Sequence, residues 1–137
     1  PNCLAPGKKP FHTLNPAMAV MNDGRIVSYG TMGGEGQPQT QAAIFARYAF
    51  HGCDLQRAIS APRWLLGKTW GDDTTSLKLE SSFDVTLINE LRDANHQVEI
   101  VSENNSLMGH AGSVVSHPDG RVEAASDARS DGIALAG

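Results

Sequence analysis

The chain has 137 residues, a hydrophobic fraction of 40% and a formal net charge of −4 from 11 basic and 15 acidic residues. This length and apolar content suit a single domain, residues 1–137, with one core. The charges are interspersed, which excludes a basic surface for nucleic acid, and no apolar run approaches the ~18 residues that indicate a membrane span.

A hairpin and a helix are predicted first. Two β-compatible runs, Ala17–Met21 and Arg25–Tyr29, flank Asn22-Asp23-Gly24, which is a strong hairpin signal. Pro38 suits the first turn of a helix, because its missing N–H would have no partner there. Gly52 can end that helix, whose predicted buried face comprises Ala42, Phe45, Ala46, Ala49 and Phe50.

Two later helices are marked by capping residues. Asp54 can cap a short helix that runs through Ile59 and stops at Ala61-Pro62. Asp84 can cap a third helix, and the spacing of apolar residues in it predicts four buried positions, Leu87, Ile88, Leu91 and Ala94.

The remaining predicted elements are strands. Leu77–Leu79 and Val98–Val101 are short, and Ala111–Ser116 forms a second hairpin with Arg121–Ala125 around Pro118-Asp119-Gly120. Hairpins with interposed helices predict an α+β fold with a mainly antiparallel sheet and helices on one face.

The segment YGTMGGEGQPQTQ, Tyr29–Gln41, places four glycines between a predicted strand and a predicted helix. Its spacing does not match the dinucleotide fingerprint, and Gly67-Lys68-Thr69 lacks the first glycine of a phosphate-binding loop. Two interpretations remain open. Consecutive backbone N–H groups could stabilise the oxyanion of an acyl transfer, or the glycines could only permit a tight turn.

Other polar and aromatic groups favour structural roles. His12-Thr13 is improbable as a nucleophile pair because neighbours in an extended segment point to opposite faces. His51 and Cys53 are too few for a zinc site, and Cys3 and Cys53 are expected to be free thiols.

Three further groups are expected to serve packing or solubility. We predict ion pairing that holds the end of the chain for Asp127, Arg129 and Asp131. Arg63, Trp64 and Trp70 could line a pocket, but buried aromatic rings and an arginine with a packed stem are the favoured interpretation. Solvated surface positions are predicted for Glu80, Glu90 and Glu99, and no pair of carboxylates is spaced for acid–base catalysis.

Several motifs in order resemble the C-terminal part of the small subunit of γ-glutamyltransferases, also called γ-glutamyltranspeptidases or glutathione hydrolases. They are KKPFHTLNP, NDGRIVSYGTMGGEGQPQTQ, SAPRW, MGHAG and ASDARSDG. The resemblance covers Lys8 to Gly137, and the wording PFHTLNP is closest to the bacterial γ-glutamyltransferase-like and cephalosporin-acylase-like branch.

This resemblance implies part of an αββα sandwich of the N-terminal nucleophile hydrolases. In the family, a precursor cleaves itself and the new N-terminal Thr attacks a γ-glutamyl amide, with its own amine as base. The resemblance assigns the oxyanion-binding N–H groups to Gly33 and Gly34. It places His12 and Thr13 where many members have two serines that contact the donor's carboxylate.

The resemblance also implies what lies outside the chain. The chain begins at Pro1, without an apolar signal region and without the family's Thr nucleophile motif, so we expect an excised fragment that is inactive alone. Its expected partners are a γ-glutamyl or glutaryl amide such as glutathione, the rest of its precursor and other copies of itself. No cofactor or metal is expected.

A non-catalytic binding or assembly module, in which the glycine segment is only a turn, is the alternative function. A Thr-Thr or Thr-Ser motif encoded some tens of residues before Pro1 would favour the enzyme.

Overall fold

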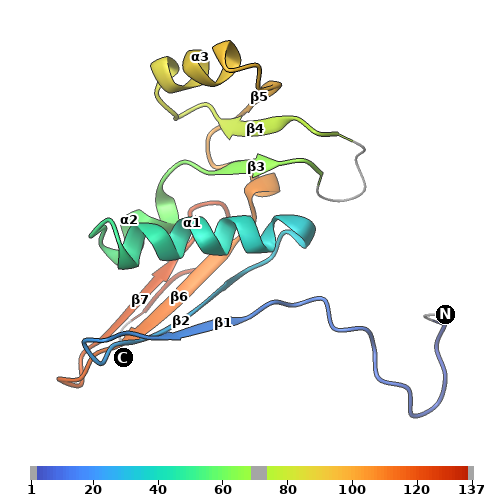
Figure 1. The fold of residues 1–137 in the computed structure, drawn as a ribbon. Helices are drawn as coiled ribbons and strands as arrows, with labels where there is room; N and C mark the ends of the chain where they lie inside the picture. The colour runs from blue at the N-terminus through green and yellow to red at the C-terminus, as the bar shows by residue number, and fades with distance from the viewer. Residues whose placement is uncertain (1–2, 69–73, 136–137) are drawn as a thin grey trace.

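Two β-sheets organise the chain in the computed structural model, which describes residues 3–68 and 74–135 (Figure 1). The larger sheet is fully antiparallel and has the strand order β1-β2-β6-β7. Its strands are β1 (Ala17–Val20), β2 (Ile26–Thr31), β6 (Ala111–Ser116) and β7 (Val122–Ser126). Both predicted hairpins are therefore confirmed, and β2 and β6 join them at the centre of the sheet.

The smaller sheet has the order β3-β4-β5. Its strands are β3 (Trp64–Leu66), β4 (Leu77–Glu80) and β5 (Val98–Val101). The β3–β4 pair is antiparallel, whereas β4 and β5 are parallel. Parallel neighbours need a long crossover, which here contains α3 (Val85–Asp93).

Helices α2 and α3 begin at the capping residues that were predicted for them. The Asp54 carboxylate accepts a hydrogen bond from the Arg57 N–H at 2.8 Å and caps α2 (Leu55–Ser60). The Asp84 carboxylate accepts one from the Thr86 N–H at 2.7 Å and caps α3. Such caps satisfy N–H groups that have no acceptor inside the helix. Helix α1 (Gln37–Ala49) carries Pro38 in its first turn.

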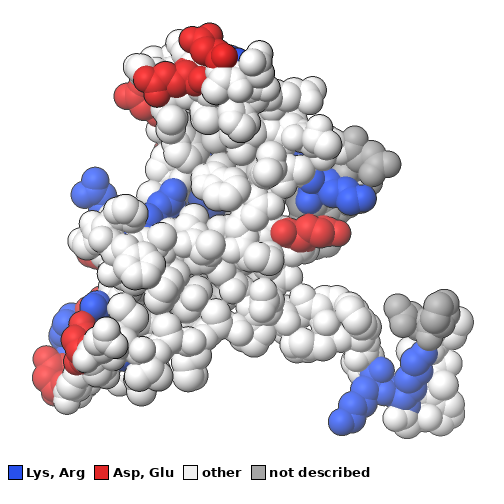
Figure 2. All heavy atoms as spheres, in the orientation of Figure 1, with Lys and Arg blue, Asp and Glu red and all other residues white. Residues whose placement is uncertain are grey.

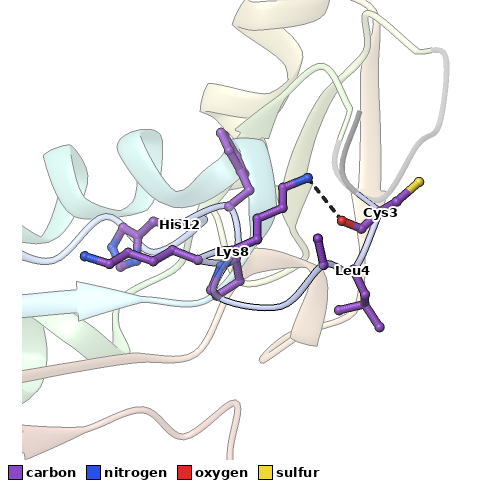
Figure 3. Close-up of a pocket in the computed structure, with 8 residues that line it drawn as sticks. Cys3, Leu4, Lys8 and His12 are labelled. Atoms are coloured by element: carbon purple, nitrogen blue, oxygen red, sulfur yellow. Dashed lines mark hydrogen bonds between the residues drawn. The ribbon is translucent and has the colours of Figure 1, made fainter.

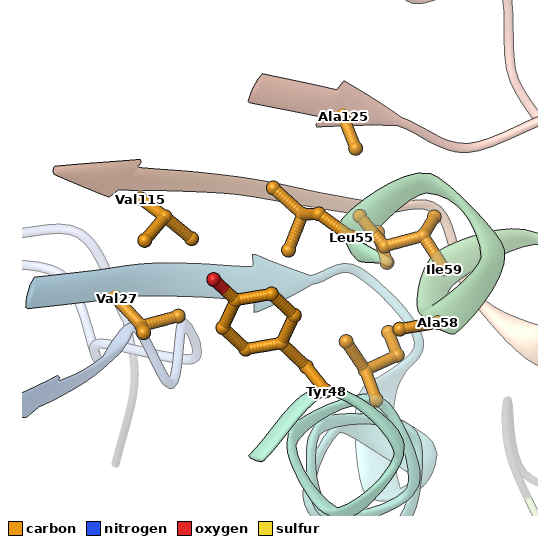
Figure 4. Close-up of a cluster of buried hydrophobic side chains, with 9 residues drawn as sticks. Val27, Tyr48, Leu55, Ala58, Ile59, Val115 and Ala125 are labelled. Atoms are coloured by element: carbon orange, nitrogen blue, oxygen red, sulfur yellow. The ribbon is translucent and has the colours of Figure 1, made fainter. Parts of the chain in front are cut away.

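The main core lies between the larger sheet and helices α1 and α2, which cover one of its faces. Tyr48 projects from α1 toward the strand residues Val27 and Val115, and Ile59 of α2 packs beside them (Figure 4). Because side chains alternate along a strand, the other face of the sheet is left outward. Val20 and Val122 are 75% and 64% exposed on that outer face.

The predicted buried face of α1 is wrong. Ala42 and Phe50 are exposed, and Phe45, Ala46 and Ala49 are only partly buried. The buried face instead comprises Gln37, Thr40, Gln41, Ile44 and Tyr48. Its polar members donate hydrogen bonds to distant backbone carbonyls, which removes the cost of burying them. A hydrophobic pattern cannot reveal such partners.

Burial in α3 is also less than predicted. Ile88 is buried, as expected, and Leu91 is partly buried. Leu87 and Ala94 are exposed, because α3 covers only the small sheet and meets it mainly through β5.

The prediction of a solvated Glu80 is wrong, because this residue at the end of β4 is completely buried. Its carboxylate pairs with Arg129 and accepts the Arg63 N–H at 2.8 Å. The ion pair predicted for Asp127 and Arg129 is confirmed at 3.0 Å, whereas Asp131 is exposed. Glu90 and Glu99 are exposed, as predicted.

Candidate functional site

The glycine segment leaves β2 and enters α1 through a short 3₁₀ turn, Gly34–Gly36. Gly33 has φ +139° and Gly34 has φ +52°. The angle at Gly33 is one that glycine alone adopts readily, and the angle at Gly34 lies in the left-handed region that disfavours most side chains but tolerates asparagine.

The structure brings all four predicted site residues to one cavity. A space of about 680 Å³ is lined by Gly33 and Gly34 from the loop and by His12 and Thr13 from the N-terminal segment. Its other lining residues are Phe11, Leu14, Met32, Glu35 and Gln37. The lining thus combines apolar side chains (Phe11, Leu14 and Met32) with polar ones (His12, Thr13, Glu35 and Gln37).

His12 also borders a second cavity, of about 640 Å³, on the N-terminal segment (Figure 3). Lys8 lines that cavity and donates to the Cys3 carbonyl at 3.1 Å. Lys8 and Lys9 give the segment a basic surface, whereas acidic side chains gather over α3 (Figure 2). Positive charge therefore lies on the same segment as His12 and Thr13, near the candidate site.

The segment Met108–Gly112 supports the glycine loop from behind. The Met32 N–H donates to the His110 carbonyl at 3.3 Å, and the Thr40 hydroxyl donates to the Met108 carbonyl at 3.1 Å. Gly109 has φ +81°, and a Cβ there would overlap the Met32 carbonyl oxygen and the Thr31 hydroxyl. The close approach of two backbones explains this glycine of the MGHAG motif.

A buried ion network holds that supporting segment. Arg63 donates to the carbonyls of Met108 and Gly109 at 3.1 and 3.0 Å and pairs with Asp127 at 2.7 Å. Burial lowers the pKa of Arg63 to about 10, although Asp127 opposes the shift, so the guanidinium is charged at neutral pH.

Asp127 is the acceptor at the centre of this network. Burial raises the pKa of its carboxyl, but the Ala111 N–H and Arg63 lower it by more, and the net pKa lies below the usual 3.8. The Ala111 N–H bond measures 2.7 Å. Arg63 is buried, as expected for a packed stem, and its guanidinium in addition makes the ion pair and hydrogen bonds above. The expectation that Trp64 is buried is wrong, because this side chain is 37% exposed.

The cysteines, His51 and Trp70 are the other residues that the sequence analysis considered. Cys3 and Cys53 are free, His51 is exposed, and the described part of the chain has no group of three potential metal ligands. Trp70 lies outside the described residues. Among the helices of the described ranges, none has the length and apolar character of a membrane span.

Sequence reasoning missed Glu35 and Gln37 as lining residues of the cavity. Both follow the glycines directly, so the signal was their position between the predicted loop and the predicted helix. A polar residue there can face a site or solvent, and the local pattern is the same in both cases.

Comparison with known proteins gives consistent results. The family model described as gamma-glutamyltranspeptidase matches residues 1–137. The chain is 58% identical over 131 residues to the oxamate amidohydrolase proenzyme of Klebsiella pneumoniae, covering 96% of this chain and 25% of that protein. It is 43% identical over 134 residues to the glutathione hydrolase-like YwrD proenzyme of Bacillus subtilis, covering 98% and 26%.

A solved structure shares the fold. The gamma-glutamyltranspeptidase of Pseudomonas nitroreducens, in complex with L-DON, superposes with a TM-score of 0.74 at 18% identity. The match covers 98% of this chain and 67% of that one. The chain thus spans about a quarter of the length of the two sequence relatives.

Proposed function

The chain belongs to the gamma-glutamyltranspeptidase family of hydrolases and transferases, and from this premise we propose that it supplies the oxyanion-binding loop of an N-terminal nucleophile amidase. The observation that carries the proposal is the shared cavity of His12, Thr13, Gly33 and Gly34. The nucleophile is contributed by the remainder of a precursor, of which this chain forms the C-terminal part.

In this proposal the reaction proceeds through an ester. The hydroxyl of the precursor's N-terminal Thr attacks the amide carbonyl, and the N–H groups of Gly33 and Gly34 stabilise the oxyanion. The tetrahedral intermediate collapses with loss of the amine, which takes up a proton. Water then cleaves the ester in hydrolysis, whereas an amine acceptor cleaves it in transfer.

The proposed substrates are amides whose acyl group ends in a carboxylate. The most similar relative reported above is named for oxamate, and the second is named glutathione hydrolase-like. Thr13 offers one hydroxyl to the carboxylate, and the His12 ring reduces the room beside it. We therefore expect monoamides of short dicarboxylic acids, such as oxamate, to be the preferred substrates. Glutaryl amides and γ-glutamyl amides such as glutathione are expected to be poorer ones.

Substitution of Gly34 in the full precursor protein tests the proposal. Gly34→Pro removes the N–H, and loss of one oxyanion donor raises the barrier by ~3 kcal/mol, which is roughly a hundredfold in turnover. Gly34→Asn is the control, because asparagine tolerates positive φ and keeps its N–H. We expect turnover to fall much less in Gly34→Asn than in Gly34→Pro.

Melting must be measured beside turnover, since proline also cannot adopt the observed φ of Gly34. If the glycines serve only a turn, the folded fraction of Gly34→Pro will turn over oxamate or glutaryl amides at the parent rate. A precursor that processes no carboxylated amide at all would instead favour a non-catalytic binding or assembly module.

A further inference from the structure

Two glutamine side chains of α1 form hydrogen bonds with the backbone of the extended segment that carries His12 and Thr13. The Gln37 amide donates to the Thr13 carbonyl at 3.0 Å and accepts from the Asn15 N–H at 3.2 Å. The Gln41 amide donates to the Asn15 carbonyl. One turn of helix separates the two glutamines, so both reach the segment from the same helix face.

Burial distinguishes these amides from ordinary surface glutamines. Gln37 and Gln41 are each 7% exposed. A buried amide is costly unless it is hydrogen-bonded, and here the segment's backbone supplies the partners. The segment depends on the glutamines in return, because residues 13–15 have no other hydrogen bond within the described parts of the chain.

These glutamine hydrogen bonds connect the two parts of the candidate site, which are the glycine loop and the segment with His12 and Thr13. Gln37 follows the glycine turn directly and itself lines the cavity with Thr13 and Gly34. Because α1 is a regular helix, it provides a common rigid mount for the loop and for the segment. These hydrogen bonds therefore tie the backbone of Thr13 and Asn15 to the helix that begins where the loop ends.

We propose that Gln37 and Gln41 are positioning residues that set the affinity for the acyl group by holding His12 and Thr13 opposite Gly33 and Gly34. This inference rests on the proposed function. The glutamines act through Thr13 and His12, which contact the carboxylate in the ground state and in the transition state alike. Loss of such uniform binding raises KM and leaves kcat unchanged.

The primary test is Gln37→Leu in the full precursor-derived enzyme, with oxamate and a glutaryl amide as donors. We expect KM for both donors to rise by roughly tenfold, which corresponds to the loss of two hydrogen bonds of ordinary strength. Gln37→Glu is the second variant. Glutamate has nearly the shape of glutamine and keeps the oxygen that accepts from the Asn15 N–H. Its carboxylate cannot donate to the Thr13 carbonyl and repels it, so we expect KM to rise in this variant as well.

Gln39→Leu is the matched control. The Gln39 amide makes the same two-bond grip, donating to the Leu66 carbonyl at 3.0 Å and accepting the Leu66 N–H at 2.8 Å. Leu66 belongs to β3 and does not line the cavity. We expect KM and kcat of Gln39→Leu to match those of the parent.

Amide hydrogen exchange separates this inference from the proposed function. Gln37→Leu should speed exchange in the peptide that contains Asn15, and Gln39→Leu should speed it at Leu66 instead. Two results would overturn the positioning role. One is faster exchange at Asn15 in Gln37→Leu while KM stays at the parent value in both Gln37 variants. The other is exchange at Asn15 that stays at the parent rate in Gln37→Leu. Full turnover in Gly34→Pro would sink the proposed oxyanion loop but not the exchange result.

Discussion

His12 is the residue at which the chain departs from the paired serines that the family resemblance implies. An imidazole is larger than a hydroxymethyl group and its ring occupies room that two serines would leave to the donor. It lines the same cavity as the glycine loop. In the precursor enzyme we expect His12→Ser to raise the ratio of γ-glutamyl to glutaryl kcat/KM by ~1 kcal/mol, about fivefold, through a gained hydroxyl contact.

Lys9→Ser is the control for that substitution, because Lys9 borders the N-terminal cavity and is not among the residues that line the candidate site. It removes a charge from the same segment without entering the candidate site. An unchanged donor ratio in His12→Ser, with both activities intact, would mean that the imidazole does not touch the donor.

The site could be predicted at the residue level only in part. A sharp turn at Gly33 and Gly34 could be expected, because adjacent glycines permit the positive φ angles found there. Their assignment to an oxyanion site came only from the family resemblance and stays a prediction. The contact of Gln37 with this segment could not be predicted, because its hydrogen-bond partner Thr13 lies 24 residues earlier in the chain. Local patterns carry no information on such a partner.

At the scale of elements, the buried ion network joins the two sheets. Arg63 precedes β3, Glu80 ends β4, and Asp127 and Arg129 follow β7. Removing one charged member leaves the opposite charges of its partners buried without compensation. We therefore expect Asp127→Asn to lower the unfolding free energy of the precursor enzyme by ~3 kcal/mol. Denaturant titration measures this cost.

The pH dependence of that cost has a definite sign. The folded-state pKa of Asp127 is lowered because, although burial raises it, the Ala111 N–H and Arg63 lower it by more. Its contribution to stability is therefore complete above the unfolded value, near 3.8, and disappears as the pH falls through the lower folded-state pKa. The stability gap between the parent and Asp127→Asn should narrow over that acidic range.

Arg121→Gln provides the comparison, because the Arg121–Glu123 pair at 2.6 Å lies at the surface. Exposed pairs contribute little, and we expect a much smaller change in unfolding free energy. Equal losses in Arg121→Gln and Asp127→Asn would show that burial does not give the network its importance.

Hydrophobic periodicity predicted the existence of α1 but not its orientation. The face chosen from apolar residues leaves Phe50 exposed, while Thr40 and Gln41 are buried. The discrepancy has one physical origin, since buried polar groups on α1 bind carbonyls of segments 13–15 and 108. Elements with local signals, such as the capped helices and the hairpins, were predicted well.

At the scale of the whole molecule, the sequence predicted the fold class but not the division into two sheets. Hairpins need only neighbouring residues, and both were found. The β2–β6 pairing joins Ile26 to Ser116 across most of the chain, and the parallel β4–β5 pair depends on a crossover. Short strands such as β3, with only three residues, carry too little pattern to be recognised.

The outer face of the larger sheet carries exposed apolar side chains. They are Met18 and Val20 of β1, Ile26 of β2, Val114 of β6 and Val122 of β7. Exposed apolar side chains gathered on one face of the isolated chain favour contact with a second copy. We therefore expect the isolated chain to self-associate with rising concentration in sedimentation velocity.

Lysine substitutions on the two edge strands test which surface is responsible. Val20→Lys with Val122→Lys should shift the isolated chain toward monomer, because burying charges in an apolar contact is unfavourable. Val85→Lys is the control, since Val85 is 68% exposed but lies on α3, away from the sheet. Circular dichroism should show the same strand content in each protein. A chain that stays monomeric at every concentration, or that Val85→Lys dissociates equally well, would exclude the outer sheet face as the contact.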